Sequence, residues 1–377
     1  MLKDESRNSP SFVVMSDTET NSNCHNLIPR VKLRDVYFSL GRWYGKNGDI
    51  EREKYKFPID EEEKTRLDIF HKFFLVARNN SLFSAPLDVE SPLRVLDIGT
   101  GTGIWAIELS ERHLALVLTM GNRKYPQMHV QGLDINMIQP EMIPRTMEPP
   151  KLHDVEGSWD TLRLDWDFIH VRTLFGSIQC WSTLYKKIFM WARSFTYLCH
   201  PIRHLKPDTG YVEQVEIDWA PQCDDNSLPP NSALHQWASR LLGGMDLYGR
   251  PMRVHPGQTR RRLALAGFTD INETVIRVCY SPWSEDGNAK EAGRWFNVGL
   301  SEGLMALSLS AMVTILGMSE KEVEVLCEKV RQEICTLSYH AYCRIYCDDY
   351  SRYMRYIWTA RKPADSHATP DNIAAED

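Results

Sequence analysis

Short apolar runs alternate with amphipathic stretches along most of the chain. Apolar runs of strand length lie at residues 93–99, 129–135, 166–172, 210–221 and 355–363. Stretches in which apolar positions recur at helical spacing lie at residues 60–80, 102–112, 182–192, 231–242 and 319–337. Because strands that alternate with helices form parallel units, this order predicts an α/β protein with a doubly wound, mostly parallel sheet. The late run predicts a closing hairpin, with an antiparallel C-terminal strand at one edge of the sheet.

Polar residues mark the ends of several of these helices. Asp60 and the acidic residues after it are typical of a helix start, and Ser319 is a good N-cap for the helix that follows it. Gly267 ends another helix, because glycine favours the left-handed backbone found there.

The two ends of the chain differ in composition from the middle. Residues 1–34 are rich in Ser, Asn, Asp and Thr without periodicity, which predicts a disordered tail, and residues 364–377 predict a second one. Residues 35–363 are expected to form a single domain with added helices. Within it, residues 35–60 predict an irregular covering segment, and a helical insertion is expected near 284–345.

Composition narrows the classes of function. The chain has 377 residues, of which 43% are hydrophobic and 25% charged, and a net charge of −6. An acidic chain lacks the basic surface that nucleic acid requires, so we expect no direct nucleic-acid partner. No stretch of 18 apolar residues predicts a membrane span, and no hydrophobic leader predicts secretion. The nine cysteines form no C-x-x-C pair, which predicts reduced thiols and no metal site.

The stretch RVLDIGTGTGIWAIEL, at residues 94–109, carries the clearest candidate chemistry. A strand, a glycine-rich turn and a helix form a ligand loop in which the backbone and the helix N-terminus approach the ligand closely. A P-loop is excluded, because Ile104 and Trp105 follow Gly103 where Lys and Ser or Thr are needed. The dinucleotide fingerprint G-x-G-x-x-G fails as well, since its third glycine is replaced by Ile104.

Acidic residues around this loop favour S-adenosylmethionine as the cofactor. Asp97 precedes the first glycine by two positions, where a carboxylate repels pyrophosphate but can serve an ammonium group. Asp134 lies at the end of the second strand run, where it can accept both ribose hydroxyls. Asp154 lies further on, within reach of an adenine amino group. S-adenosylmethionine offers all three groups.

Several motifs together resemble the LaeA-like methyltransferases of filamentous fungi: RLDIFHKFFLVAR, LDIGTGTGIWAIEL, GLDINMIQP, LKPDTGYVEQVEID and ARKP. The resemblance covers about residues 40–363. It implies a Rossmann-like class I methyltransferase fold with a mostly parallel sheet of seven strands, a role in secondary metabolism and velvet-type regulatory proteins as partners. For the cofactor it implies the loop residues Asp97, Gly99, Thr100, Gly101, Thr102 and Gly103 at the methionine end, Asp134 at the ribose, and Asp154 and Val155 near the adenine.

Three segments are longer than the family pattern requires: residues 112–123, 191–202 and 347–355. Each is either a surface insertion, since long loops cost little entropy, or translated intron. The apolar character of the first two favours the intron interpretation slightly. A third interpretation for residues 112–123 is an additional helix packed on the domain.

Other side chains carry two interpretations each. His170, at the end of a strand run, is either a general base near the acceptor or a structural histidine. Trp43, Tyr44 and Tyr55 either close over the sulfonium or simply pack. Glu213 and Glu216 are three apart in a strand, so they lie on opposite faces and cannot act as a pair.

Cysteines and histidines that hint at metal spacing, namely Cys199, His200, His204, His340, Cys343 and Cys347, are better explained as scattered side chains. The basic pairs and triplets of the chain, such as residues 186–187 and 260–262, are better explained as solvated helix faces than as an import signal.

Two classes of function follow. The first is an enzyme that transfers a methyl group to a small-molecule or protein acceptor in the nucleus or cytoplasm, with catalytic residues left open because alignment and desolvation supply most of the rate. The second is a regulatory subunit of a nuclear velvet-type complex, with methylation secondary or absent.

Overall fold

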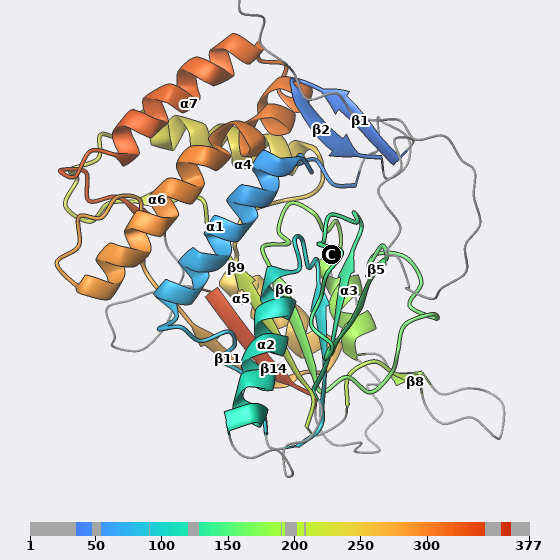
Figure 1. Cartoon of the computed structure of the whole chain (residues 1–377). Coiled ribbons are helices and arrows are strands. Elements are labelled where there is room, and N and C mark those ends of the chain that lie inside the picture. Colours follow the sequence, from blue (N-terminus) through green and yellow to red (C-terminus); the bar gives the residue numbers. More distant parts are fainter. Residues whose placement is uncertain are drawn as a thin grey trace, which may run out of the picture.

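A seven-stranded sheet forms the centre of the molecule (Figure 1). This computed structural model describes residues 35–46, 54–89, 91–119, 128–189, 191–192, 202–206, 209–343 and 356–362. The strand order is β11-β14-β9-β6-β3-β4-β5. The strands are β3 (Leu93–Ile98), β4 (Met128–Asp134), β5 (Met147–Leu152), β6 (Phe168–Arg172), β9 (Tyr211–Glu216), β11 (Thr269–Thr274) and β14 (Tyr356–Arg361). Neighbouring strands from β9 to β5 are parallel, which confirms the predicted mostly parallel sheet.

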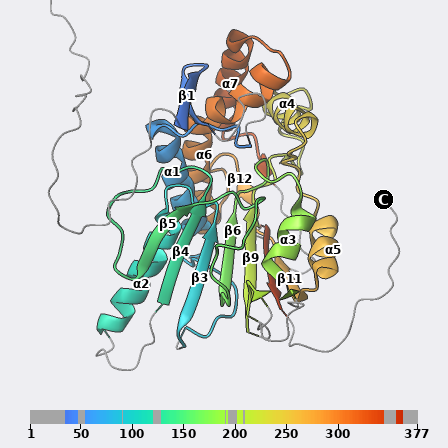
Figure 2. The ribbon, with the colours of Figure 1, turned by 90° about the vertical axis from the view of Figure 1, so that its right-hand side faces the viewer.

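Helices cover both faces of this sheet (Figure 2). They are α2 (Ile104–Thr119) on one face, and α3 (Trp181–Phe189) and α5 (Pro256–Ala266) on the other. The alternation of β3 explains why both faces are apolar: Val95 packs in the cluster that contains α2, whereas Leu96 and Ile98 pack in the cluster that contains α3 and α5. The strands of a parallel sheet that is covered on both faces are therefore continuous apolar runs in the sequence.

The C-terminal strand is antiparallel, as predicted, but its expected position at the edge is wrong. β14 pairs antiparallel with β9 on one side and with β11 on the other, so β11 is the edge strand. The reason is that β11, which follows α5, does not pair with β9 but lies one strand position further out in the sheet. The open position between β9 and β11 is then filled by β14, a later strand.

A second layer of helices lies over the carboxyl ends of the strands. It contains α1 (Glu61–Ala77), α4 (Ala233–Leu247), α6 (Gly287–Ser308), the π-helical continuation η3 (Leu309–Ile315) and α7 (Glu320–Ile334). Small two-residue strands complete this part of the chain: β10 (Pro221–Gln222), β12 (Val278–Cys279) and β13 (Tyr342–Cys343). Ser319 caps α7 in a full capping box with Glu322, and Asp60 caps α1, as their positions in the sequence predict.

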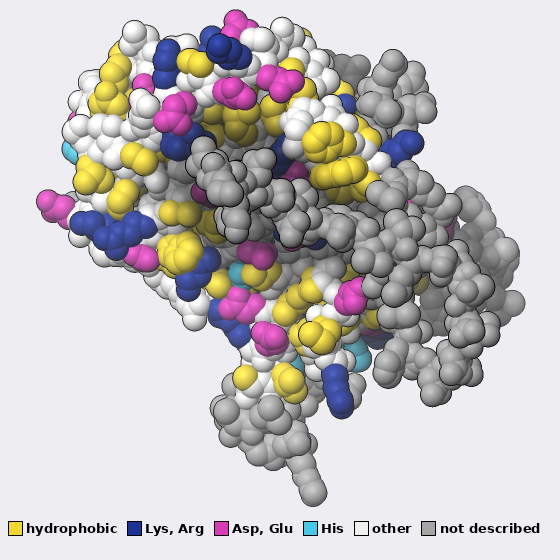
Figure 3. Space-filling view, turned by 45° about the horizontal axis from the view of Figure 1, so that its top comes forward, with side chains coloured by type: hydrophobic (Ala, Val, Ile, Leu, Met, Phe, Trp, Pro, Cys, Tyr) yellow, Lys and Arg dark blue, Asp and Glu magenta, His cyan; other side chains and the backbone are white. Residues whose placement is uncertain are grey.

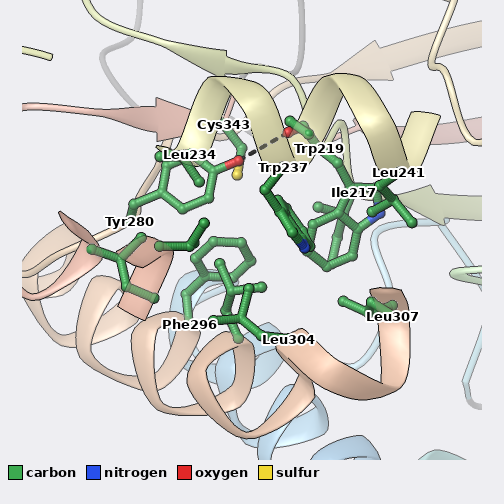
Figure 4. Packing of buried hydrophobic residues seen from close by; sticks show 14 of the residues in the cluster. Ile217, Trp219, Leu234, Trp237, Leu241, Tyr280, Phe296, Leu304, Leu307 and Cys343 are labelled. Carbon is green, nitrogen blue, oxygen red and sulfur yellow. Dashed lines mark hydrogen bonds between the residues drawn. The ribbon is translucent and has the colours of Figure 1, made fainter. Parts of the chain in front are cut away.

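The core of this helical layer is largely aromatic. Figure 4 shows Phe296 of α6 facing Tyr280 and Trp237, and the Tyr280 hydroxyl donates to the Trp219 carbonyl at 3.0 Å. α1 packs closely on α6 because α6 presents glycines there. A Cβ on Gly299 would lie 2.7 Å from the Phe70 ring, so any larger residue would push the two helices apart.

The helical stretch Gly287–Ile315 is long and apolar enough by composition to cross a bilayer. Most of it is buried, and Phe296, Leu300 and Leu304 are inaccessible to solvent in the core of the helical layer. The composition is therefore accounted for by a core helix. On the face drawn in Figure 3, acidic and basic side chains are interspersed over the helical layer.

The prediction that residues 35–60 form an irregular covering segment is wrong in part. Residues 36–45 form a hairpin of β1 (Val36–Ser39) and β2 (Arg42–Gly45), with Leu40 and Gly41 at positive φ in the turn. Alternating aromatic residues pair across it, as in Phe38 against Trp43. The turn lacks the usual Asn-Gly signal, which is why the hairpin escapes sequence reasoning.

The three long segments are described only partly. Residues 112–119 continue α2, where the Arg112 guanidinium donates to Glu108 and to Asn80, and His113 is buried. These eight residues therefore lengthen α2 and do not form a separate additional helix. Residues 120–127, 193–201 and 347–355 lie outside the described residues, and short strands flank the second segment: β7 (Trp191–Ala192) and β8 (Ile202–Arg203). The predicted tails, 1–34 and 364–377, also lie outside them.

Candidate functional site

The glycine-rich loop lies between the end of β3 and the start of α2. Gly99, Gly101 and Gly103 have φ values of +69°, +58° and +79°, a left-handed backbone that favours glycine at every second position. The backbone N–H groups of Gly99 and Thr100 donate to the Leu133 carbonyl at 2.9 Å, which ties the loop to β4. Residues 99–102 line one cavity at the carboxyl ends of the strands.

Asp134 lies at the end of β4 and lines the same cavity. One carboxylate oxygen accepts from the Gly101 N–H at 2.8 Å and the other from the Asn136 N–H at 2.9 Å. Burial raises the pKa of Asp134 to about 6, and the two backbone donors offset only part of that effect. The carboxylate is therefore aligned with the loop and ready to accept further donors when ionised.

Asp154 and Val155 line the cavity beside Lys54. An Asp154 oxygen accepts from the Glu156 N–H at 2.9 Å, and the carboxylate forms an ion pair with the Lys54 ammonium. Burial alone would raise the pKa of Asp154, but Lys54 and the N–H of Glu156 hold it below its usual value. The structure thus brings the loop, Asp134, Asp154 and Val155 around one space.

Asp97 and Gly103 are not among the residues that line this cavity. Asp97 is buried beneath the loop, where one oxygen accepts from the Thr100 hydroxyl at 2.6 Å and the other contacts His170 Nδ1 at 2.8 Å. The expected contact between Asp97 and an ammonium group stays a prediction, while in the structure its carboxylate contacts Thr100 and His170. Its carboxylate supports the loop from below instead.

His170 is a structural histidine, and its interpretation as a general base is wrong. The side chain is fully buried and stacks on the Trp105 ring with centroids 3.7 Å apart. Burial lowers its pKa, so the neutral ring donates its Nδ1–H to Asp97. Of the three aromatic candidates, Tyr55 lines the cavity, whereas Trp43 and Tyr44 do not.

Sequence reasoning misses a second set of cavity residues, which come from elements far apart in the chain. They include Phe57, Arg66, Leu67, Phe70, Phe74, Arg172, Phe175, Glu216, Trp219 and Leu307. The one available signal is position: Arg172 ends β6 and Glu216 ends β9, as Asp134 ends β4. Most of the others require the helical layer to be in place.

Glu216 is a buried carboxyl whose partners are neutral. It accepts from the backbone N–H groups of Leu174 and Phe175 and from the side-chain amide of Gln214, each at 3.1 Å. Burial raises the pKa of Glu216 to about 8, so the group is protonated at neutral pH. Glu213, on the opposite face of β9, contacts Arg78 instead, as strand periodicity predicts.

The raised pKa of Glu216 predicts a pH dependence of stability. Below the usual pKa near 4.5 the group is protonated in both the folded and the unfolded chain. Between that value and about 8 only the unfolded chain ionises, so the contribution of this group is lost as pH rises through the folded pKa. We expect the free energy of unfolding to fall more from pH 5 to pH 9 in the parent than in Glu216→Gln, measured by urea unfolding. Glu302→Gln, an exposed change, should follow the parent; parallel profiles for all three proteins would contradict the assignment.

Among the described residues, no group of three His, Cys, Asp or Glu side chains is placed to hold a metal ion. Of the candidates at metal spacing, Cys199, His200 and Cys347 lie outside that part of the chain.

Residues 70–272 match the sequence family described as a methyltransferase domain. The chain is 44% identical over 333 residues to the secondary metabolism regulator laeA of Fusarium oxysporum f. sp. lycopersici, covering 88% of this chain and 93% of that protein. It is 40% identical over 341 residues to LAE1 of Cochliobolus heterostrophus, covering 90% and 98%. It is 34% identical over 310 residues to laeA of Aspergillus fumigatus, covering 82% and 73%.

Proposed function

The chain belongs to the methyltransferase-domain family of the LaeA and LAE1 secondary metabolism regulators, and on that premise we propose that it binds S-adenosylmethionine in the cavity described above. Its activity is transfer of a methyl group to an acceptor that enters the same cavity. The single observation that carries this proposal is the convergence of the loop at 99–102 with Asp134 and Asp154 around one space.

The residues present fit this cofactor. A Cβ added at Gly101 would point toward Leu67 Cδ1, 3.5 Å away, so the missing side chain leaves room between the loop and α1. Residues 99–102 would hold the methionine part, Asp134 the ribose hydroxyls, and Asp154 with Val155 the adenine. When bound, the cofactor supplies a methyl group already activated by its sulfonium. The chain then needs to orient the acceptor and exclude water, which the aromatic lining favours.

Asp134→Ala tests this assignment directly. We expect the affinity for S-adenosylhomocysteine, measured by calorimetry on the full chain, to fall by about 2–3 kcal/mol, because two hydroxyls lose a charged acceptor. The parent should also lose affinity roughly tenfold from pH 7 to pH 5, since Asp134 is protonated below its pKa of about 6.

Asp246→Ala is the matched control, because that carboxylate forms an exposed ion pair with Arg253 and does not line the cavity. It should bind like the parent. Absence of binding to well-folded parent protein would sink the proposed function, and binding of NAD under the same conditions would count against it.

A second candidate, a regulatory subunit in which methylation is secondary, is favoured by the relatives, which are named as regulators. For this role we propose a nuclear or cytoplasmic protein with velvet-type regulatory partners. Complementation of a deletion strain separates the two candidates. If Asp134→Ala restores the parent's metabolite profile, methyl transfer is not required for the biological role. If it restores none of that profile, methyl transfer is required. Imaging and co-purification of the tagged protein test the location and the partners.

A further inference from the structure

Three cations line the cavity within the described residues, and two of them are neutralised by a carboxylate. Lys54 forms an ion pair with Asp154, and Arg66 forms a buried pair with Glu63. The third, Arg172, has no carboxylate within ion-pair distance among the described residues. The carboxylates of Asp97, Glu108 and Glu213 act on Arg172 only from beyond that distance, and burial lowers its pKa to about 10. The guanidinium can therefore accept a direct anionic partner in the cavity, which would offset the cost of its burial.

Two contacts fix the guanidinium of Arg172 in place. Its centre lies 4.9 Å from the Phe74 ring on α1, and one terminal nitrogen lies 3.2 Å from His71 Nδ1. The other ring nitrogen of His71 contacts Glu108 at 2.5 Å. Burial, and to a smaller extent the positive charge of Arg172, lower the pKa of His71 to about 4. The neutral ring therefore donates to Glu108 and accepts from Arg172. Within the part of the chain that the structure describes, this is one bond from a guanidinium that has five N–H donors.

The carboxyl groups that share the cavity with Arg172 do not cancel its charge. Glu156 pairs with Arg250 at 2.9 Å, and Glu216 is protonated at neutral pH because burial raises its pKa to about 8. Asp134 and Asp154 belong to the set assigned above to the cofactor. In the part of the cavity lined by α1 and the segment after β9, Arg172 is thus the cation that forms no direct ion pair with a carboxyl group of the described residues.

Several aromatic residues line the same cavity as Arg172. Phe70 and Phe74 of α1, Phe175 after β6 and Trp219 after β9 all line the cavity, and the Phe70 and Trp219 ring centroids lie 6.2 Å apart. Such walls suit a flat, apolar ligand that carries a single charged group. The carboxylate of the cofactor has a different site available at the glycine loop, beside the N-terminus of α2.

We propose that Arg172 binds the carboxylate of the methyl acceptor, and that the acceptor is a small aromatic acid rather than a neutral molecule. This inference rests on the proposed function, because it takes the glycine loop and Asp134 as the cofactor end of the cavity. It gives the acceptor a chemical class and a point of attachment. His71 is a positioning residue that orients the guanidinium.

The test uses the full chain saturated with S-adenosylhomocysteine. Benzoate, 1-naphthoate and 9-anthroate are titrated beside their primary amides, which keep the rings and remove the charge. At least one acid should bind the parent about tenfold more tightly than its amide, as expected for a charge-assisted hydrogen bond. Arg172→Met should abolish that preference, Arg172→Lys should keep part of it, and Arg253→Met, an exposed change outside the cavity, should keep all of it.

Several results would overturn the proposal. One is equal binding of acids and amides, or no binding of any of them, to parent protein that binds S-adenosylhomocysteine; this comparison needs no variant. Another is a preference for acids that survives in Arg172→Met. A third concerns the cofactor: if Arg172→Met weakens S-adenosylhomocysteine but not 5′-methylthioadenosine, which lacks the amino-acid part, Arg172 serves the carboxylate of the cofactor. Failure of the parent to bind S-adenosylhomocysteine would instead refute the proposed function.

Discussion

Replacing Gly101 by valine is expected to abolish cofactor binding while the protein stays folded. The position has a φ of +58°, and a β-branched residue held there costs about 1–3 kcal/mol in backbone strain. The new Cβ would lie 3.5 Å from Leu67 Cδ1, so the two methyl groups of valine would occupy the space between the loop and α1. Calorimetry with S-adenosylhomocysteine should show a loss on the order of 100-fold or more, about 3 kcal/mol.

Gly317→Val separates strain from occupation of the cavity. Gly317 has a comparable φ of +72°, lies between η3 and α7, and has open space around the position of a Cβ. We expect it to lower the thermal midpoint but to leave the affinity unchanged. Parent-like binding by Gly101→Val would show that the loop does not contact the cofactor. An equal loss of affinity in Gly317→Val would show that strain alone explains the effect.

Replacing Arg78 by methionine should strongly destabilise the folded protein. Arg78 follows α1, and its guanidinium donates to the fully buried carboxylate of Glu213 at 2.8 Å. The same carboxylate accepts from the backbone N–H groups of Ser84 and Ala85, so it ties the segment after α1 to β9. Removing one partner of a buried pair leaves an uncompensated charge, and we expect the free energy of unfolding to fall by about 3–5 kcal/mol.

Urea unfolding of matched variants checks this value. Arg294→Met removes an exposed pair with Glu291 on α6 and should cost less than about 1 kcal/mol. Arg78→Met combined with Glu213→Gln should recover part of the stability, because the buried charge is removed as well. If Arg78→Met costs no more than Arg294→Met, the buried pair does not stabilise the connection between α1 and β9.

Local patterns account for what could be predicted from the sequence. Strands appear in the sequence as apolar runs because both faces of the sheet are covered. Asp60 and Ser319 indicate the starts of their helices because capping is a local interaction. The loop at 99–103 and Asp134 are recognisable because a parallel strand presents its ligand residues at its carboxyl end.

What could not be predicted depends on contacts between distant segments. Asp97 and His170 are direct register partners on β3 and β6. Their side chains are hydrogen-bonded to each other, and neither faces the cavity. That pairing follows from the register, which the separate strands do not reveal. Arg172 and Trp219 become neighbours of α1 only once the helical layer has closed over the sheet. The position of β14 between two earlier strands has the same origin.

The insertion of β14 between β9 and β11 bears on how the chain is made. A ribosome releases β9 and β11 well before it releases the strand that joins them, since residues 275–355 are translated in between. At the usual speed of synthesis this interval lasts about 4–16 s. Throughout it, β9 presents an unpaired edge on a nascent polypeptide, the kind of surface to which chaperones bind and through which chains aggregate. Slow codons across that interval would prolong the exposure, so yield in a heterologous host should depend on codon choice there more than elsewhere in the gene.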